Sequence, residues 1–286
     1  MNIVALVALK NENWIIDTTF PILRQITKNI LVANNNSTDN SLDLLAKYNV
    51  EIFESENINH SNKIRWELLD KSRELFGNNC LIICIDADEF ITPSLFEKNL
   101  TSIYQHKPGT AFYSPWVQLW RSVDKYRAGN SAWNPKNNFK PFMFLDDGRI
   151  DYIRNFVIND HTSRIPEIDK KYHKKLNFPL IHLQFANWKR SQFKQLWYQF
   201  IEVISGLEID EINNKYAVAS NEKDLVLKKM KRKWMKNIQI QKNILDSNYE
   251  DIWYIKEINL MLKRYGTKPF EGLNLYNSIY IDKIIK

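Results

Sequence analysis

The sequence is poor in the features that mark disulfide-rich, disordered or membrane-spanning chains. Of its 286 residues only two are cysteines, Cys80 and Cys84, and both lie in or beside an apolar run. We therefore expect buried thiols in a reducing compartment. Only seven glycines and nine prolines occur, without a low-complexity tract, so long disordered segments are not expected. No apolar run approaches the about 20 residues that span a bilayer, and no charged-then-apolar signal opens the chain. These absences predict a cytoplasmic protein.

The charge of the chain indicates an anionic partner. The formal net charge is +7 and the sequence pI is about 9.1, which suits nucleic acid, an acidic membrane face or a phosphorylated substrate. Composition does not choose among these partners. With 44% hydrophobic residues, the chain can form one large α/β domain with an appendage, or two small domains.

Short apolar runs alternate with helical patterns along the first hundred residues. The runs that predict buried strands are 2–9, 30–33, 50–53 and 81–85. The segments with helical spacing are 14–26, which contains Pro21 as a break or kink, 42–45 and 60–76. This alternation predicts a parallel sheet with helices on both faces. Because ligands bind beyond the carboxyl ends of such strands, residues 34–39 and 86–89 should line that crevice.

The second half of the chain has a different pattern. Strand-like runs occur at 111–119, 142–145, 152–158 and 180–183, separated by loops rich in aromatic and basic residues. We interpret them as the second half of one mixed sheet. After Trp188 the pattern is helical, most clearly at 189–205 and 224–245.

The most informative stretch is Asp86-Ala87-Asp88-Glu89-Phe90. Two acids flank one small residue directly after a buried strand. An extended Asp-x-Asp segment can direct one carboxylate at a divalent cation and the other at a sugar hydroxyl. Mg²⁺ and Mn²⁺ prefer oxygen ligands and bridge readily to a diphosphate. The alternative is an ordinary acidic turn at a strand end.

Together with this motif, two further segments resemble the family 2-like glycosyltransferases in order and spacing. These segments are Val7-Ala8-Leu9-Lys10-Asn11-Glu12 and Asn34-Asn35-Asn36-Ser37-Thr38-Asp39-Asn40-Ser41. A weaker similarity to bacterial lipopolysaccharide and capsule transferases covers residues 179–183, Phe193-Lys194 and Tyr198. The resemblance implies an α/β GT-A fold: a mixed, mostly parallel sheet flanked by helices. It divides the chain into a catalytic domain at 1–205, with a nucleotide-sugar half (1–100) and an acceptor half (101–205), and a helical extension at 206–286.

The resemblance also implies roles for individual residues. Asp88 would hold Mn²⁺ or Mg²⁺, and His182 would approach the metal or the diphosphate from the acceptor side. Asp86 would contact the donor ribose or a metal-bound water. The implied nucleotide-sugar-binding residues are Lys10, Asn11, Glu12, Asn34, Asp39, Arg65 and Asp86. From its sequence context alone, a histidine within the apolar run FPLIHLQF is more often a core residue.

One position departs from the family pattern. The family usually has Asp where this chain has Asn34, and that carboxylate often accepts the N3–H of uracil. An Asn carbonyl can still accept that bond, but a turned amide would suit cytosine. A UDP-sugar is the expected donor, although Asn34 also leaves room for a cytidine nucleotide.

The base that deprotonates the acceptor hydroxyl must be a carboxylate within hydrogen-bond reach. The candidates between the metal motif and His182 are Asp124, Asp146, Asp147, Asp151, Asp160 and Glu167. Related transferases have a Val-His-Glu stretch about twenty residues before the histidine segment. Here that place contains Asp160 and His161, so we predict Asp160 as the catalytic base.

Two further features leave alternatives open. The basic run 228–236 predicts a helix on an anionic membrane, a nucleic-acid contact or a solvated helix face. The aromatic group of Trp116, Trp120, Tyr126 and Trp133 suits either sugar stacking or core packing.

The sequence therefore predicts a metal-dependent, inverting glycosyltransferase of surface-glycan assembly. It would use a nucleotide-sugar donor and a saccharide or lipid-linked acceptor, with possible membrane contact through 228–236 and no nucleic acid. A nucleotidyltransferase is the enzymatic alternative, although the Gly-rich basic loop it usually needs does not follow the first strand. A basic adaptor with a decayed site is the non-enzymatic alternative.

Overall fold

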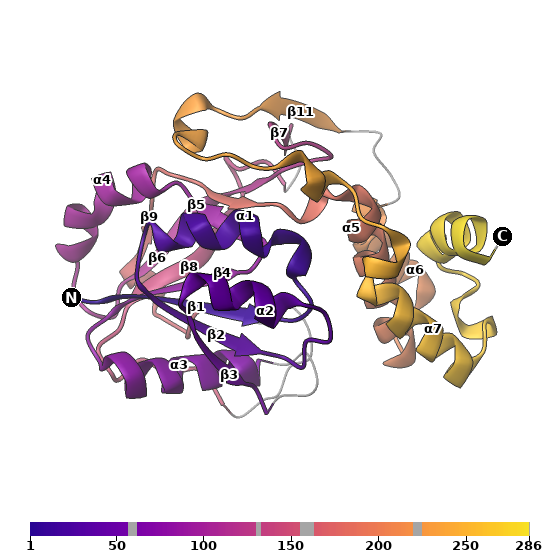
Figure 1. Ribbon diagram of the computed structural model, residues 1–286, viewed down its shortest axis with the longest axis horizontal. Helices are drawn as coiled ribbons and strands as arrows, with labels where there is room; N and C mark the ends of the chain where they lie inside the picture. The colour runs from indigo at the N-terminus through magenta and orange to yellow at the C-terminus, as the bar shows by residue number, and fades with distance from the viewer. Residues whose placement is uncertain (57–61, 130–132, 155–162, 220–224, 286) are drawn as a thin grey trace. The chain divides into compact units, whose positions relative to one another are not determined.

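The computed structural model describes residues 1–56, 62–129, 133–154, 163–219 and 225–285, with side chains described as far as 280. The chain forms two compact units, which we call the sheet unit and the helical unit (Figure 1). The sheet unit comprises Met1–Gln118, Asn130–Leu183 and Lys229–Gln241. The helical unit comprises Leu119–Gly129, Gln184–Lys228 and Lys242–Lys286. The predicted functional division at residue 205 stays a prediction.

A mixed sheet forms the centre of the sheet unit. Within the described residues it has nine strands in the order β3-β2-β1-β4-β8-β6-β10-β5, with β9 also paired to β6. The strands are β1 Ile3–Leu9, β2 Asn29–Asn34, β3 Glu51–Glu54, β4 Leu81–Asp86, β5 Glu89–Ile91, β6 Ala111–Gln118, β8 Phe139–Leu145, β9 His173–Lys175 and β10 Leu180–His182. Most pairs are parallel, while β8 runs antiparallel to β4 and β6, and β5 runs antiparallel to β10. The predicted α/β class with a mixed, mostly parallel sheet is confirmed.

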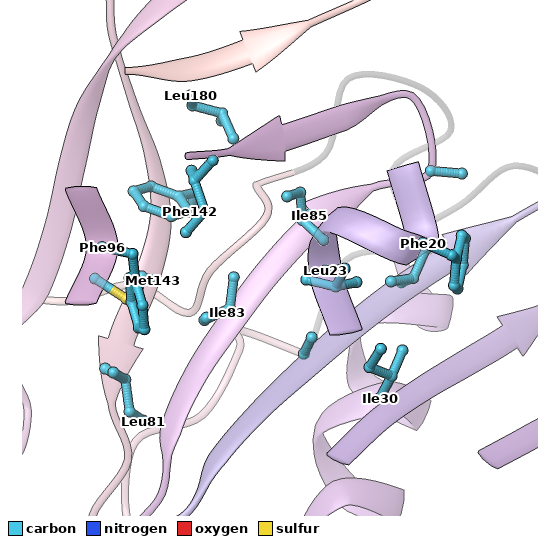
Figure 2. Close-up of a cluster of buried hydrophobic side chains, with 14 of the residues drawn as sticks. Phe20, Leu23, Ile30, Leu81, Ile83, Ile85, Phe96, Phe142, Met143 and Leu180 are labelled. Atoms are coloured by element: carbon cyan, nitrogen blue, oxygen red, sulfur yellow. The ribbon is translucent and has the colours of Figure 1, made fainter. Parts of the chain in front are cut away.

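Helices cover both faces of this sheet, which explains the continuous apolar strands. The helices are α1 Asn13–Arg24, α2 Ser41–Leu45, α3 Lys63–Phe76 and α4 Pro93–Tyr104. Alternate residues of β1 serve opposite faces: Val7 packs in the cluster that contains α1 and α4, and Leu6 packs in the cluster that contains α3. Figure 2 shows the first cluster, in which Phe20 of α1 and Phe96 of α4 contribute to the layer over the strands. Pro21 lies within α1, which continues through it.

The strand directions bring the chemically interesting ends to one edge of the sheet. The carboxyl ends of β1, β2, β4, β6 and β10 lie there, because these five strands run in the same direction. The antiparallel strands β8 and β5 begin at that edge. We call it the carboxyl edge. Asp86 ends β4 and His182 ends β10, so both lie on it.

The helix predicted at 224–245 is wrong. The segment forms strand β11 (Val226–Lys229) and short 3₁₀ turns at Arg232–Met235 and Lys242–Leu245. Strand β11 pairs with β7 (Lys125–Ala128), a partner about a hundred residues away that local periodicity does not reveal. Trp234 is buried, and its carbonyl accepts a hydrogen bond from the Thr92 hydroxyl. The basic run 228–236 therefore presents no helical face.

The prediction of a strand at 152–158 is also wrong for the residues that the structure describes. Tyr152–Arg154 are not in a strand, and residues 155–158 lie outside the described part of the chain. The Tyr152 hydroxyl instead donates to the Arg164 carbonyl at 2.8 Å.

The helical unit has an aromatic core of its own. Its helices are α5 Trp188–Ile204, α6 Ile209–Lys215, α7 Trp253–Tyr265 and the C-terminal π-helix Tyr276–Ile285. Phe200 and Phe270 stack there with ring centroids 3.8 Å apart. The helices predicted after Trp188 are thus confirmed at 189–205 and in the C-terminal extension. None of the helices in the described chain is both long and apolar enough to cross a bilayer.

Candidate active site

The Asp-x-Asp segment forms a tight turn at the carboxyl edge. Strand β4 ends at Asp86 and β5 begins at Glu89, so only Ala87 and Asp88 connect them. Two hydrogen bonds hold this turn: the Thr19 hydroxyl of α1 donates to the Ala87 carbonyl at 2.7 Å, and the Leu183 N–H donates to the Asp88 carbonyl at 2.8 Å. Helix α1 and strand β10 therefore fix the direction of the acidic side chains.

Two arginines hold the Asp86 carboxylate. Arg65 Nη2 lies 2.7 Å from one oxygen, and Arg164 Nη2 lies 2.7 Å from the other. Burial alone would raise the pKa of Asp86, but the charges of Arg164 and Arg65 outweigh it and hold that pKa well below its usual range. The side chain is still 32% exposed. Asp86 is thus ionised, fixed in position and within reach of a ligand.

Glu89 connects the acidic turn to the second half of the sheet. Its carboxylate is fully buried and accepts hydrogen bonds from three donors. Arg164 Nη1 lies 2.5 Å away, Trp116 Nε1 lies 2.8 Å away, and the Asp86 N–H lies 3.2 Å away. A buried carboxylate with such partners orders all the groups that donate to it. Arg164 therefore bridges Asp86 and Glu89.

Asp88 and His182 form the pair that could hold a metal. Strand pairing places His182 directly opposite Glu89, and its ring stacks on Trp116 with centroids 5.1 Å apart at 19°. His182 Nε2 lies 3.1 Å from Asp88 Oδ1. Both side chains are nearly buried.

The donor set of this pair fits a divalent ion that is shared with a substrate. Neighbouring ligands of an octahedral ion with bonds of about 2.1 Å lie about 3.0 Å apart, close to the 3.1 Å between Asp88 Oδ1 and His182 Nε2. In the described part of the chain, no group of three or more His, Cys, Asp or Glu side chains gathers to bind a metal. Mg²⁺ is typically bound by one or two carboxylates together with substrate phosphates and water. Diphosphate and water would therefore have to supply the other positions.

The residues predicted near the nucleotide join two loops at the ends of β1 and β2. Asn11, with φ of 53°, accepts hydrogen bonds from the Thr38 and Asp39 N–H groups at 2.7 and 3.2 Å. Asp39 in turn accepts from the Asn13 N–H at 3.2 Å. Glu12 accepts from Trp14 Nε1 at 2.5 Å, and Lys10 is half-buried where β1 ends. These side chains build the loops, and their contact with a nucleotide stays a prediction.

Both polar atoms of the Asn34 side chain form hydrogen bonds to neighbouring residues on the same edge. Its Oδ1 accepts from the Ser37 N–H at 3.2 Å, and its Nδ2 donates to both carboxylate oxygens of Glu54, at 2.9 and 2.8 Å. Glu54 ends β3 and is exposed. A carboxylate therefore lies next to the position where the family usually has one, although it comes from another strand.

The structure brings some of the predicted residues together and separates others. Asp86, Asp88, Arg65 and His182 belong to one network. Two of the candidate bases form ion pairs elsewhere: Asp146 pairs with Arg73, and Asp151 pairs with Arg154. The predicted base Asp160 and its neighbour His161 lie outside the described residues, so their positions stay predictions.

Sequence reasoning missed three residues of the network. Glu89 was visible in the motif but received no role, and Trp116 was noted only as one of several aromatics. Arg164 lies in an irregular loop without periodicity, and no sequence signal identified it. The bonds to Asp86 and Glu89 identify it here.

Comparison with known proteins assigns the chain to a family. Residues 4–172 match the family model described as Glycosyl transferase family 2. No curated protein matches the chain. S. aureus TarS is 14% identical with a TM-score of 0.46 over 77% of this chain, which spans only 43% of that one. TarS 1–349 in complex with UDP-GlcNAc is 12% identical with a TM-score of 0.42, over 96% of this chain and 84% of that one. Glucosyl-3-phosphoglycerate synthase from Mycobacterium tuberculosis, in complex with Mn²⁺, UDP and glucosyl-3-phosphoglycerate, is 16% identical with a TM-score of 0.29, over 42% and 44%.

Proposed function

Because this chain belongs to glycosyl transferase family 2, we propose that it moves a sugar from a nucleoside-diphosphate donor, most simply a UDP-sugar, to a saccharide or lipid-linked saccharide of a surface glycan. Its mixed, mostly parallel sheet flanked by helices is the GT-A fold that the resemblance predicted. The observation that carries the proposal is the turn between β4 and β5, where Asp88 lies 3.1 Å from His182 beside the clamped Asp86.

In this proposal the donor lies along the carboxyl edge. Its base and ribose lie over the ends of β1 to β3, beside the loops that Asn11 and Asn34 order, where the exposed Glu54 carboxylate offers a hydrogen-bond acceptor. Asp86 accepts a hydroxyl of the donor, and Arg65 and Arg164 keep its carboxylate oriented and charged. Fixed partners of this kind reduce the reorganisation needed at the moment of reaction.

The same proposal gives Asp88 and His182 the task of holding Mn²⁺ or Mg²⁺. When bound, the ion would neutralise charge on the leaving diphosphate. Trp116 supports this task, because its ring stacks on His182 and its N–H is fixed by Glu89.

We keep Asp160 as the catalytic base of an inverting reaction. A base touches the acceptor and not the diphosphate, so Asp160→Asn should lower kcat by about 10²–10⁴-fold while donor affinity stays nearly constant. Glu167→Gln is the matched control, because Glu167 is an exposed acid of the same region. If Glu167→Gln loses turnover and Asp160→Asn keeps it, the base is Glu167.

Membrane contact through 228–236 is no longer part of the proposal. That expectation depended on a helical basic face, and the segment forms a strand end and a 3₁₀ turn instead.

A thermal-shift screen of nucleoside diphosphates tests the proposal. A ligand that binds only the folded state at about a hundred times its Kd stabilises the protein by about 2.7 kcal/mol. We expect UDP with Mn²⁺ to raise the melting temperature by several degrees, UDP alone to raise it less, and Asp88→Asn to lose the Mn²⁺-dependent part. If no nucleoside diphosphate shifts the wild-type protein under either condition, the proposal fails.

A further inference from the structure

Lys140 is a cation of the sheet unit that pairs with no carboxylate among the described residues. It lies at the start of β8, on the carboxyl edge, and is half-buried. Its Nζ is 4.7 Å from the centroid of the Trp116 ring. Among the described residues no carboxylate forms an ion pair with it. Burial lowers the pKa of Lys140, and the nearby Arg164 charge lowers it further against the opposing effect of Glu89. This ammonium is thus partly dehydrated, and the Glu89 charge offsets that loss only in part.

Trp116 provides the surface on which Lys140 lies. Its indole N–H is fixed by Glu89, and it stacks on Trp133 with centroids 6.0 Å apart at 22°. Trp116 and Trp133 are both half-buried, so part of this aromatic surface faces solvent. The guanidinium of Arg164 lies 5.9 Å from the same indole.

The aromatic contact alone does not satisfy Lys140. A cation over a Trp ring contributes about 0.5–2 kcal/mol, but an ammonium has three N–H donors and a ring face engages only part of them. Two nearby acids already have other partners. Asp86 pairs with Arg65 and Arg164, and Glu89 binds Arg164 and the Trp116 N–H. A phosphate or carboxylate oxygen would form the strong, charge-assisted hydrogen bonds that are missing.

The position of Lys140 assigns this anion to the acceptor. Asn34 lies on β2 and Lys140 on β8, three strand positions apart in the sheet, which is roughly 14 Å at about 4.8 Å per strand. The Asp86–Asp88 turn, where the diphosphate would lie, ends β4 between them. Lys140 and Trp116 therefore lie on the side away from the nucleotide.

We propose that Lys140, held over the Trp116 ring, forms a subsite for a negatively charged saccharide acceptor, with the ammonium binding a phosphate or carboxylate group. The proposal rests on the proposed sugar transfer and names the chemical class of its acceptor. It goes beyond the family assignment, which leaves the charge of the acceptor open.

Binding of three matched sugars by the full chain, saturated with UDP and Mn²⁺, tests the subsite. The probes are glucose, glucuronate and glucose 6-phosphate, which differ chiefly in charge, and the measurement is isothermal titration. We expect one of the charged probes to bind at least about tenfold more tightly than glucose, the effect of a hydrogen bond to a charged group. Whichever is preferred distinguishes carboxylate from phosphate recognition. Lys140→Met should remove the preference and leave UDP affinity unchanged.

Lys175→Met is the matched control. Lys175 also lies over an aromatic ring, with Nζ 4.6 Å from the centroid of Phe139, but it is exposed, so its loss should leave the preference intact. Equal affinity of the wild type for all three sugars would overturn the proposal. So would a Lys140→Met variant that loses UDP affinity, because Lys140 would then serve the donor. If the wild type fails to bind UDP at all, the proposed function itself fails, whatever the sugars do.

Discussion

Two aspartates at opposite ends of the β4–β8 ladder are held by arginines of the same helix. Asp86 ends β4 and pairs with Arg65 in the first turn of α3, whereas Asp146 follows β8 and pairs with Arg73 in the last turn. Arg73 follows Arg65 by eight positions, about 12 Å along the helix axis. The two pairs have similar chemistry but different surroundings, and the difference in exposure decides which carboxylate a ligand can reach.

The Asp146 pair is closed. Its side chain is 0% exposed, and Arg73 binds both oxygens, at 2.9 and 2.7 Å. The Gly148 N–H adds a third bond at 3.2 Å, and Arg73 also donates to the Ile150 carbonyl at 2.5 Å. All these bonds fix the turn after β8 to α3, and no oxygen remains accessible to a ligand.

The Asp86 pair is open. Its side chain is 32% exposed, and its second arginine, Arg164, comes from a loop and also binds Glu89. The carboxylate is fixed without being enclosed. We infer that the arrangement at Asp146 serves stability and the arrangement at Asp86 serves the ligand.

The largest expected difference between the two ends is in stability. Asp146→Asn leaves the Arg73 charge without its buried partner, so the free energy of unfolding should fall by about 3–5 kcal/mol. Asp86→Asn should cost clearly less, because solvent can reach that position and Arg164 keeps Glu89. Urea denaturation of both variants measures the difference. Equal losses at the two ends, with donor binding intact in Asp86→Asn, would show that both pairs are structural.

A smaller effect, on donor kinetics, is expected from Glu89→Gln, which removes the negative charge that pairs with Arg164 beside Asp86. The amide can still accept from Trp116 but no longer forms an ion pair with Arg164, so Asp86 and His182 lose part of their support. Changes behind metal ligands typically cost 10–100-fold in activity. We expect a loss of kcat/KM for the donor in that range.

Trp116→Phe keeps the ring that stacks on His182 and removes the N–H that donates to Glu89. It should therefore retain more activity than Glu89→Gln. If Glu89→Gln keeps wild-type kinetics, Glu89 is only a buried structural acid.

The smallest expected effect is on the pH dependence of the free energy of unfolding, and it comes from Asp147, next to Asp146. Burial alone would raise the pKa of Asp147, but hydrogen bonds from the Arg149 and Ile150 N–H groups outweigh it and lower that pKa. A lowered pKa stabilises the fold above the unfolded-state value of about 3.9, and the stabilisation is lost as the pH falls through the folded-state value.

The free energy of unfolding of the wild type should thus exceed that of Asp147→Asn by a constant amount above about pH 5, and the gap should narrow below about pH 4. Acid titration of both proteins, followed by chemical denaturation at each pH, measures this gap. A gap that does not change with pH would show that the fold does not lower the pKa of Asp147.

The strands that sequence predicted well are those buried on both faces. β1, β2 and β4 are continuous runs of Val, Ile, Leu and Ala because helices cover both sides. β5 and β11 were missed, since each is only three or four residues long and depends on a partner distant in sequence. In 224–245, lysines and apolar residues at helical spacing outweighed any local sign of a strand.

The same limit applies to the candidate site. Asp86, Asp88, Arg65 and His182 were found because a short motif and its resemblance carry them. Arg164 contributes as strongly to the charge at Asp86, yet it meets that carboxylate only after the chain has crossed the sheet, 78 residues further on. Contacts of that kind depend on the fold and have no local pattern.

Release of UDP from a UDP-sugar tests the proposed reaction most directly. We predict turnover by the wild type with Mn²⁺, loss of turnover when EDTA removes the metal, and a loss of about 10²–10³-fold in Asp88→Asn, the scale seen when a charge-stabilising group is removed. His182→Ala should lose less, because water can replace one ligand. The melting temperatures of both variants should stay near that of the wild type. A folded Asp88→Asn protein that releases UDP at the wild-type rate would contradict the assignment of the β4–β5 turn as the site of transfer.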